Sequence, residues 1–195
     1  DHVTVFWIAP DQLGLGTNTM AIGFDLEPEW HVYWKNPGDS GTAPKVTLKS
    51  DHATLSELRW PTPVKLPLGD LMNFGYGNPA GLVFDVTPKS ATSVEIEAQL
   101  EWLVCRAEEC VPGRGTLRFK GDVAQTGPHW GAESRAKLQF LTNVIPAVVT
   151  NPKAQPLRLQ RWEVHSDGTV DLVVEANGPV PNIEIFPVEG DWLQP

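Results

Sequence analysis

The alternation of hydrophobic and polar residues along the chain is typical of a protein built mainly from β-strands. The clearest strand covers residues 93–105, where apolar side chains occupy every second position from Val94 to Trp102 and polar ones occupy the positions between. A period of two predicts one buried and one hydrated face. Residues 115–123 return as the next strand, so we expect the intervening segment to be a strand end and a turn.

Shorter segments predict further strands and two loops. We expect strands on either side of Pro28 within residues 20–34, and at residues 45–50 and 82–88. Residues 36–44 have the composition of a loop. Residues 59–81 are so rich in Pro and Gly that we expect a long structured loop, and long ordered loops in compact domains are often functional.

One segment of the second half has the spacing of an amphipathic helix. Residues 131–146 carry apolar side chains three and four positions apart, and Pro146 ends the pattern. Residues 151–156 are typical of a linker. Two strands are expected around Ser166–Gly168, followed by a third at residues 182–188.

These elements predict a mainly β fold in three parts. We expect a β domain at residues 1–125 that carries the cysteines, a helix and linker at 126–156, and a small second β domain at 157–195. Three strands make a thin domain. We therefore expect the last part to borrow a face from the first or to be cut short.

Composition and charge narrow the class of protein. The 195 residues suffice for a real core, and a formal net charge of −9 argues against nucleic acid and anionic membranes as partners. No stretch approaches the length of a membrane span, and the start lacks the pattern of a signal peptide. We therefore expect a mature or excised chain that does not itself cross a membrane.

The two cysteines, Cys105 and Cys110, are separated by four residues at the predicted strand end and turn. As a structural disulfide they would close a very short loop, worth about 2 kcal/mol in the loop-entropy model. As a reactive pair they could face each other across a hairpin, because opposed strand positions lie about 4.5–5.5 Å apart, within disulfide range. The residues themselves leave both alternatives open. The histidines lack the spacing of zinc ligands, so we expect no metal site.

Three segments carry a resemblance to a known family. They are "WHVYWKNPGDSGTAP", "LPLGDLMNFGYGN" and "EWLVCRAEECVPG", in that order. Together they resemble the N-terminal periplasmic domain of DsbD-like thiol:disulfide interchange proteins, with most similarity to the ScsB branch (suppressor of copper sensitivity protein B). The resemblance covers residues 3–123 with good specificity and implies an immunoglobulin-like β-sandwich with the two cysteines on neighbouring strands.

The resemblance also implies a function. The chain would be the soluble periplasmic domain of an inner-membrane protein and would act as a protein-disulfide reductase without a bound cofactor. Electrons would reach Cys105 and Cys110 from a thioredoxin-like domain and a transmembrane domain of the same full-length protein. They would then pass to a periplasmic thioredoxin-fold substrate, such as an ScsC-like protein or a disulfide isomerase.

Residue roles follow from the same resemblance. Cys110 would attack the partner's disulfide and Cys105 would resolve the mixed disulfide. A cap loop would cover the pair, with Phe74 or Tyr76 as its lid and His31 and Tyr33 as aromatic residues near the pair. The residues that match the cap loop are Asn73, Phe74, Gly75, Tyr76 and Gly77.

Two features of the sequence depart from the family pattern, and there are two alternatives to the reductase function. DsbD itself has a wider cysteine spacing, and it places the lid phenylalanine directly beside the tyrosine, whereas Gly75 separates Phe74 from Tyr76 here. One alternative is a non-enzymatic β-sandwich binding module with a structural disulfide. The other is a copper-handling domain, which two methionines and the absence of a Met/His cluster argue against.

Overall fold

The structure is a computed structural model in which the chain forms two compact units, Asp1–Pro146 and Ala147–Pro195. The two units are described separately. The residues described are 2–107, 109–147, 157–167, 169–179 and 183–188.

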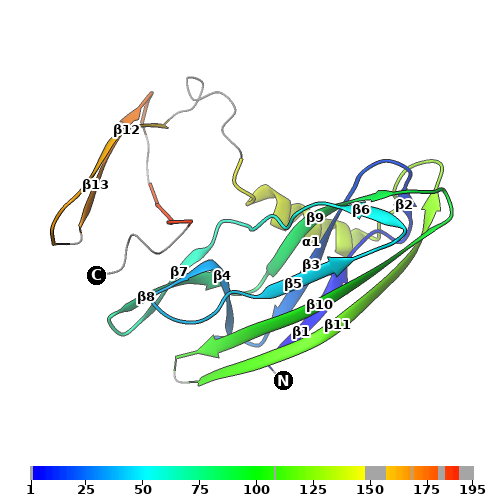
Figure 1. Ribbon diagram of the computed structural model, residues 1–195, viewed down its shortest axis with the longest axis horizontal. Helices are drawn as coiled ribbons and strands as arrows, with labels where there is room; N and C mark the ends of the chain where they lie inside the picture. Colours follow the sequence, from blue (N-terminus) through cyan, green and yellow to red (C-terminus); the bar gives the residue numbers. More distant parts are fainter. Residues whose placement is uncertain (1, 108, 148–156, 168, 180–182, 189–195) are drawn as a thin grey trace. The chain divides into compact units, whose positions relative to one another are not determined.

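The first unit is a sandwich of two β-sheets (Figure 1). The smaller sheet has the order β1 (Val3–Ile8), β3 (Asn18–Leu26), β9 (Ala80–Pro88), β6 (Ala53–Leu55). The larger has the order β2 (Leu13–Gly14), β11 (Glu109–Ala124), β10 (Ser93–Arg106), β4 (His31–Gly38), β8 (Leu71–Tyr76), β7 (Val64–Leu68), with β5 (Lys45–Lys49) also paired to β10. Aromatic contacts join the sheets: Trp7 lies 6.1 Å from Phe119 and Phe24 lies 6.5 Å from Trp102, between ring centroids.

The smaller sheet is covered on both faces. Its inner face meets the larger sheet, while Ile8, Ala21 and Val83 form a row across three strands of the outer face. Leu141 of α1 (Ala132–Asn143) packs on this row and is 2% exposed. Because both faces are covered, β3 and β9 carry nearly continuous buried runs instead of an alternation. Among the described residues, no helix is long and apolar enough to cross a membrane.

β10 and β11 form the long hairpin that the sequence predicted. The register is regular from Ser93 opposite Asp122 to Arg106 opposite Glu109. The even-numbered apolar residues of β10 face the sandwich interior, and the odd-numbered residues face outwards. β11 begins at Glu109, earlier than the strand at 115–123 that the sequence predicted. The hairpin therefore extends up to the turn that follows the first cysteine.

The expectation of one long loop at residues 59–81 was wrong. β7 and β8 form a hairpin within this segment, and Gly69, with φ of 59°, lies in the turn between them. Pro67 is tolerated because β7 is an edge strand, where one side needs no backbone donor. The loop expected at residues 36–44 was wrong in its first part, because β4 continues to Gly38.

The second unit contains the predicted hairpin, formed by β12 (Leu157–Val164) and β13 (Val170–Ala176). The third strand expected at residues 182–188 was wrong over its described part, since residues 183–188 form no strand. Pro187 has no backbone N–H to contribute to a ladder there. The mainly β fold with one short helix and a second β unit is confirmed. The three-part division stays a prediction, and α1 lies within the first unit.

Candidate functional site

Cys105 and Cys110 form a disulfide at the end of the β10–β11 hairpin. They occupy directly opposed positions in the register, with their Cα atoms 4.1 Å apart. Arg106 and Glu109 form the next pair and close the hairpin around the turn. The prediction that the cysteines face each other across a hairpin is confirmed. The bond links two strands that their own ladder already holds side by side.

The two cysteines differ in accessibility. Cys105 is 2% exposed, while Cys110 is exposed. The strand order explains the difference. β10 has β4 on its other side at Cys105. Among the described residues, β11 is paired on its outer side only at Val123 and Ala124, by β2. Cys110 therefore lies on a free sheet edge, where a second protein can reach its sulfur.

His31 lies directly beside the disulfide. It is the Cα partner of Cys105 on β4, so Cys110, Cys105 and His31 form one row across three strands. Residues opposed in this way share a sheet face. The Nε2 atom of His31 is buried and, among the described residues, has no hydrogen-bond partner. Burial lowers the pKa of His31, which favours a neutral imidazole beside the buried cysteine.

Tyr33 is the next residue of β4 on the same face. Its ring lies edge-on to that of His31, with 5.2 Å between the centroids, and burial raises its pKa. The loop after β4 packs on this ring through Gly41, whose φ is 89°. A Cβ atom on Gly41 would lie 2.2 Å from Tyr33 Cζ, so only glycine allows the approach. The structure thus places His31 beside Cys105 and Tyr33 beside His31 on the same face, while the roles of both residues stay predictions.

Four of the predicted cap-loop residues, Asn73 to Tyr76, lie on β8, two strands away from β10, and the fifth, Gly77, follows the strand. Gly75 is the partner of Tyr33 and shares its face. Tyr76 is the partner of Val32 and therefore lies on the opposite, interior face, and Phe74 alternates with Gly75 to that same side. The structure does not bring Phe74 or Tyr76 to the cysteine face. Their role as a cover stays a prediction.

The polar groups of this segment have structural partners. The Tyr76 hydroxyl donates to the Pro61 carbonyl at 2.7 Å, and burial raises the Tyr76 pKa. Asn73 is 1% exposed, and its side-chain oxygen accepts a hydrogen bond from the Ser40 backbone N–H at 2.9 Å. Gly77 follows the strand, with open space around it. These contacts fasten β8 to the loop after β4 and to the segment before β7.

Arg106 and Glu109 form an ion pair beside the disulfide. Arg106 donates to the Glu109 carboxylate at 2.8 Å, and its guanidinium lies 5.2 Å from the centre of the Trp30 ring. A positive charge beside the cysteines would favour a thiolate, but the ion pair with Glu109 offsets the charge of Arg106. Trp30 in turn stacks on His2 at 3.9 Å. Within the described parts of the chain, no three His, Cys, Asp or Glu side chains gather in a way that could hold a metal ion.

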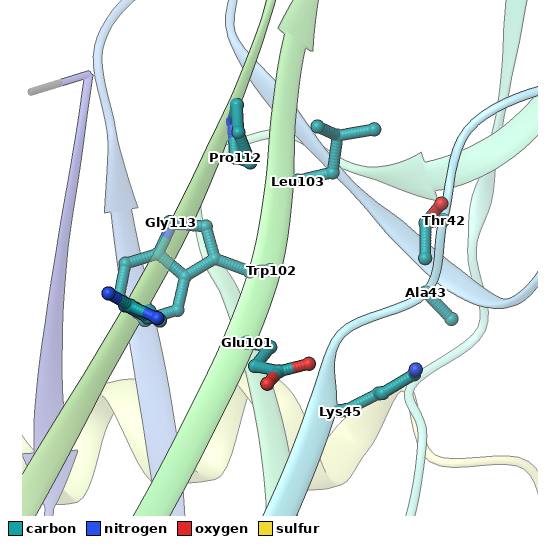
Figure 2. A pocket seen from close by; sticks show the side chains of 9 residues that line it. Thr42, Ala43, Lys45, Glu101, Trp102, Leu103, Pro112 and Gly113 are labelled. Carbon is teal, nitrogen blue, oxygen red and sulfur yellow. The ribbon is translucent and has the colours of Figure 1, made fainter.

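The structure contains a groove beside the disulfide that was not predicted from the sequence. It has a volume of about 410 Å³ and lies between the hairpin and the segment that leads into β5 (Figure 2). Leu103 and Pro112 line it and stand two positions from Cys105 and Cys110 on their strands. Alternation along β10 could have placed Leu103 on the cysteine face. The contribution of residues 42–45 depends on long-range pairing, which the local pattern does not reveal.

Known proteins resemble the chain in sequence and in structure. The sequence model of the family described as thiol:disulfide interchange protein DsbD, N-terminal, matches residues 7–120. No curated protein matches the sequence significantly. The crystal structure of the N-terminal periplasmic domain of ScsB from Proteus mirabilis aligns over 97% of this chain and 72% of its own, with a TM-score of 0.67 and 18% identity. The reduced Neisseria meningitidis DsbD n-terminal domain aligns over 62% and 86%, with a TM-score of 0.38 and 11% identity. The immunoglobulin-like fold is confirmed by the first of these structures.

Proposed function

The chain belongs to the family of N-terminal domains of the thiol:disulfide interchange protein DsbD, and on this premise we propose that it is a periplasmic protein-disulfide reductase domain. It receives two electrons from thioredoxin-like and membrane domains of the same full-length protein. It passes them through Cys105 and Cys110 to a periplasmic thioredoxin-fold partner, such as an ScsC-like protein or a disulfide isomerase. The observation that carries the proposal is a disulfide with one accessible cysteine at the free end of a hairpin.

The hairpin supports a reversible bond better than a structural one. β10 and β11 are in register over their full paired length, from Ser93 to Arg106 of β10. A disulfide between residues five positions apart contributes about 2 kcal/mol in the loop-entropy model. The ladder and the buried face of β10 remain when the bond opens. The scaffold therefore holds the two sulfurs in place in both redox states.

The reaction is a pair of thiol–disulfide exchanges. The Cys110 thiolate attacks one sulfur of the partner's disulfide, so a mixed disulfide forms and the partner's other sulfur leaves as a thiolate. The Cys105 thiolate then attacks Cys110 Sγ, which re-forms the intramolecular bond and releases the partner's second thiolate. Two electrons pass to the partner. The protons lost by Cys105 and Cys110 balance those that the partner's thiols take up.

Oxidation equilibria of the intact chain test this function. The protein is equilibrated in thiol–disulfide buffers of known potential, and its free thiols are then alkylated and counted by mass spectrometry. The chain has two cysteines, so every thiol counted belongs to this pair. We expect a midpoint above about −300 mV, within reach of thioredoxin-like reductants at about −270 mV.

The alternative function gives a different result in the same measurement. A binding module with a structural disulfide would hold its bond at potentials well below about −300 mV. A reduction midpoint in that range would contradict the proposed relay of electrons. A chain that loses its cooperative unfolding transition on reduction would also favour the structural role, because a relay must keep its fold in both redox states.

A further inference from the structure

We propose that the groove beside the disulfide is the docking site for an extended segment of the partner protein that flanks the attacked cysteine. The segment carries an apolar side chain two residues from its cysteine and an acidic side chain four residues from it. This inference rests on the proposed function and specifies which sequence around a partner's cysteine the domain prefers. The residues that define it are Leu103, Pro112, Glu101, Arg114 and Lys45.

The groove and the disulfide share one face of the hairpin. In the regular register Cys105 opposes Cys110, Leu103 opposes Pro112, and Glu101 opposes Arg114. Every second pair of an antiparallel ladder projects from the same face, and successive pairs of this kind lie about 7 Å apart. On this face, the apolar pair Leu103–Pro112 is therefore the pair next to the disulfide along the hairpin. The charged pair Glu101–Arg114 follows it.

The groove exists because β10 changes its neighbouring strand at this point. β4 pairs with Val104 and Cys105, and β5 pairs with β10 from Glu97 to Glu101. No strand pairing is made with Trp102 and Leu103 on that side within the described residues. The chain bends away through Thr42 and Ala43, which form the wall opposite Leu103 (Figure 2). The hollow of about 410 Å³ can hold a few side chains of a bound segment.

The charges of the groove favour an acidic ligand. Lys45 and Arg114 both oppose Glu101, one from β5 and one from β11, so three charged side chains form a row with a net charge of +1. All three are exposed. The chain as a whole carries −9, so this row is locally cationic on an acidic protein. An acidic side chain placed here meets two cations and gains more than a basic one.

An extended peptide matches the spacing of these features. Its side chains on one side also recur every two residues, about 7 Å apart. A peptide cysteine held at Cys110 places the second residue along over Leu103 and Pro112. The fourth residue then lies over Arg114, Glu101 and Lys45. Apolar contact next to the reacting sulfur and charge pairing beyond it fix the direction and position of the segment.

The test uses peptides in which both directions carry the same pattern. The peptide Asp-Gly-Leu-Gly-Cys-Gly-Leu-Gly-Asp is joined through its cysteine to 5-thio-2-nitrobenzoate, whose release by the reduced chain is followed by absorbance. We expect it to react about fivefold faster than the same peptide with Lys in place of Asp, at low ionic strength. We also expect Ser in place of Leu to slow the reaction. In about 1 M salt the Asp/Lys preference should shrink.

Charge reversal in the groove locates the preference. Arg114→Glu should abolish or invert the Asp/Lys preference. Arg118→Glu is the matched control, because Arg118 lies on the same face of β11, about 13 Å further along, and its side chain is 81% exposed. Equal rates for the Asp and Lys peptides, or an equal effect of the two variants, would overturn the docking site.

Reduction of a small disulfide distinguishes failure of the docking site from failure of the proposed function. Glutathione disulfide is too short to reach the charged row. If the wild-type chain reduces glutathione disulfide but shows no peptide preference, the docking site is overturned and the redox function is retained. If the chain reduces neither substrate, the proposed function is overturned, and the docking site with it.

Discussion

Cys105 and Cys110 face each other across one hairpin, yet only one of them is accessible. Cys105 is 2% exposed between two strands, while Cys110 lies on the outer side of β11. Exchange requires the partner's sulfur to approach the attacking sulfur, so access selects the cysteine that takes part in the intermolecular step. The exposed position of Cys110 is what we would expect of an attacking cysteine, and the assignment of attack to Cys110 stays a prediction.

Replacing Cys105 by serine should trap the partner. The reduced variant keeps the exposed Cys110, which can attack, but it has no second thiol to resolve the mixed disulfide. We expect a covalent complex with an oxidised thioredoxin-fold protein as the main product on non-reducing electrophoresis, and mass spectrometry should locate the link at Cys110. The Cys110→Ser variant is the matched control and should give little complex. A complex that forms mainly with Cys110→Ser would reverse the two roles.

Residue-level features divide into those that local sequence specifies and those that it does not. The opposition of Cys105 and Cys110 follows from a short turn between two alternating strands, so the sequence could predict it. The faces of Phe74 and Tyr76 could not be predicted, because they depend on how β8 is aligned with β4. A shift of one residue in that register would exchange the faces of the whole strand. Nothing within residues 73–77 determines this alignment.

Gly113 of the β10–β11 hairpin lies where a larger side chain would collide with a neighbouring ring. The Trp102 indole lies across Gly113, its partner on β11 (Figure 2). A Cβ atom on Gly113 would lie 2.3 Å from the indole Nε1 atom, whereas one on Gly115 would lie 3.4 Å from Cη2. The ring also packs edge-on against Phe24 of the other sheet. Gly113 thus allows Trp102 to connect the hairpin to the smaller sheet.

Alanine at these two glycines should have opposite consequences. Gly113→Ala must displace the indole from its contact with Phe24, and overpacking of this kind costs about 1–3 kcal/mol. Gly115→Ala meets the ring at ordinary contact distance and should be neutral or stabilising by up to about 1 kcal/mol, since it restricts the unfolded chain. Urea unfolding followed by tryptophan fluorescence measures both. Equal destabilisation by the two variants would show that the indole contact is not what requires glycine.

Element-level prediction succeeded where one face of a strand is hydrated. β10 alternates over its whole length, and its pattern gave the strand directly. β1 was not predicted because most of it, from Val5 to Ile8, is an unbroken apolar run without alternation. The β7–β8 hairpin was mistaken for a loop because an edge strand tolerates proline and a turn uses glycine. Composition alone does not distinguish these uses of Pro and Gly.

At the scale of the whole chain, the helix belongs to the packing of the first unit. All the buried hydrophobic side chains among the described residues lie between Ile8 and Leu141. Leu141 closes the outer face of the smaller sheet, and Phe6, Trp130, Leu138 and Ile145 pack around the same cluster. The Val144 carbonyl also accepts a hydrogen bond from the Thr62 backbone N–H at 2.8 Å. We propose that the redox domain extends to residue 146, beyond the boundary at 125 that the sequence suggested.

Two truncations test this boundary. A chain of residues 1–146 retains the helix and its contacts. Its unfolding midpoint in urea should therefore equal the midpoint at which the first unit unfolds within the full chain. A chain of residues 1–125 exposes Ile8, Ala21 and Val83 to water. Since loss of a buried leucine typically costs 2–5 kcal/mol, we expect its free energy of unfolding to fall by at least about 2 kcal/mol.

Point variants of the full chain separate loss of packing from loss of length. Leu141→Ala should reproduce much of the destabilisation seen with residues 1–125, because it opens the same apolar row. Phe140→Ala is the matched control, since Phe140 is 48% exposed on the same helix and its removal should change stability by no more than about 0.5 kcal/mol. Equal stability of the 1–125 and 1–146 chains would instead place the boundary at residue 125. The helix would then be a connector that the redox domain does not need in order to fold.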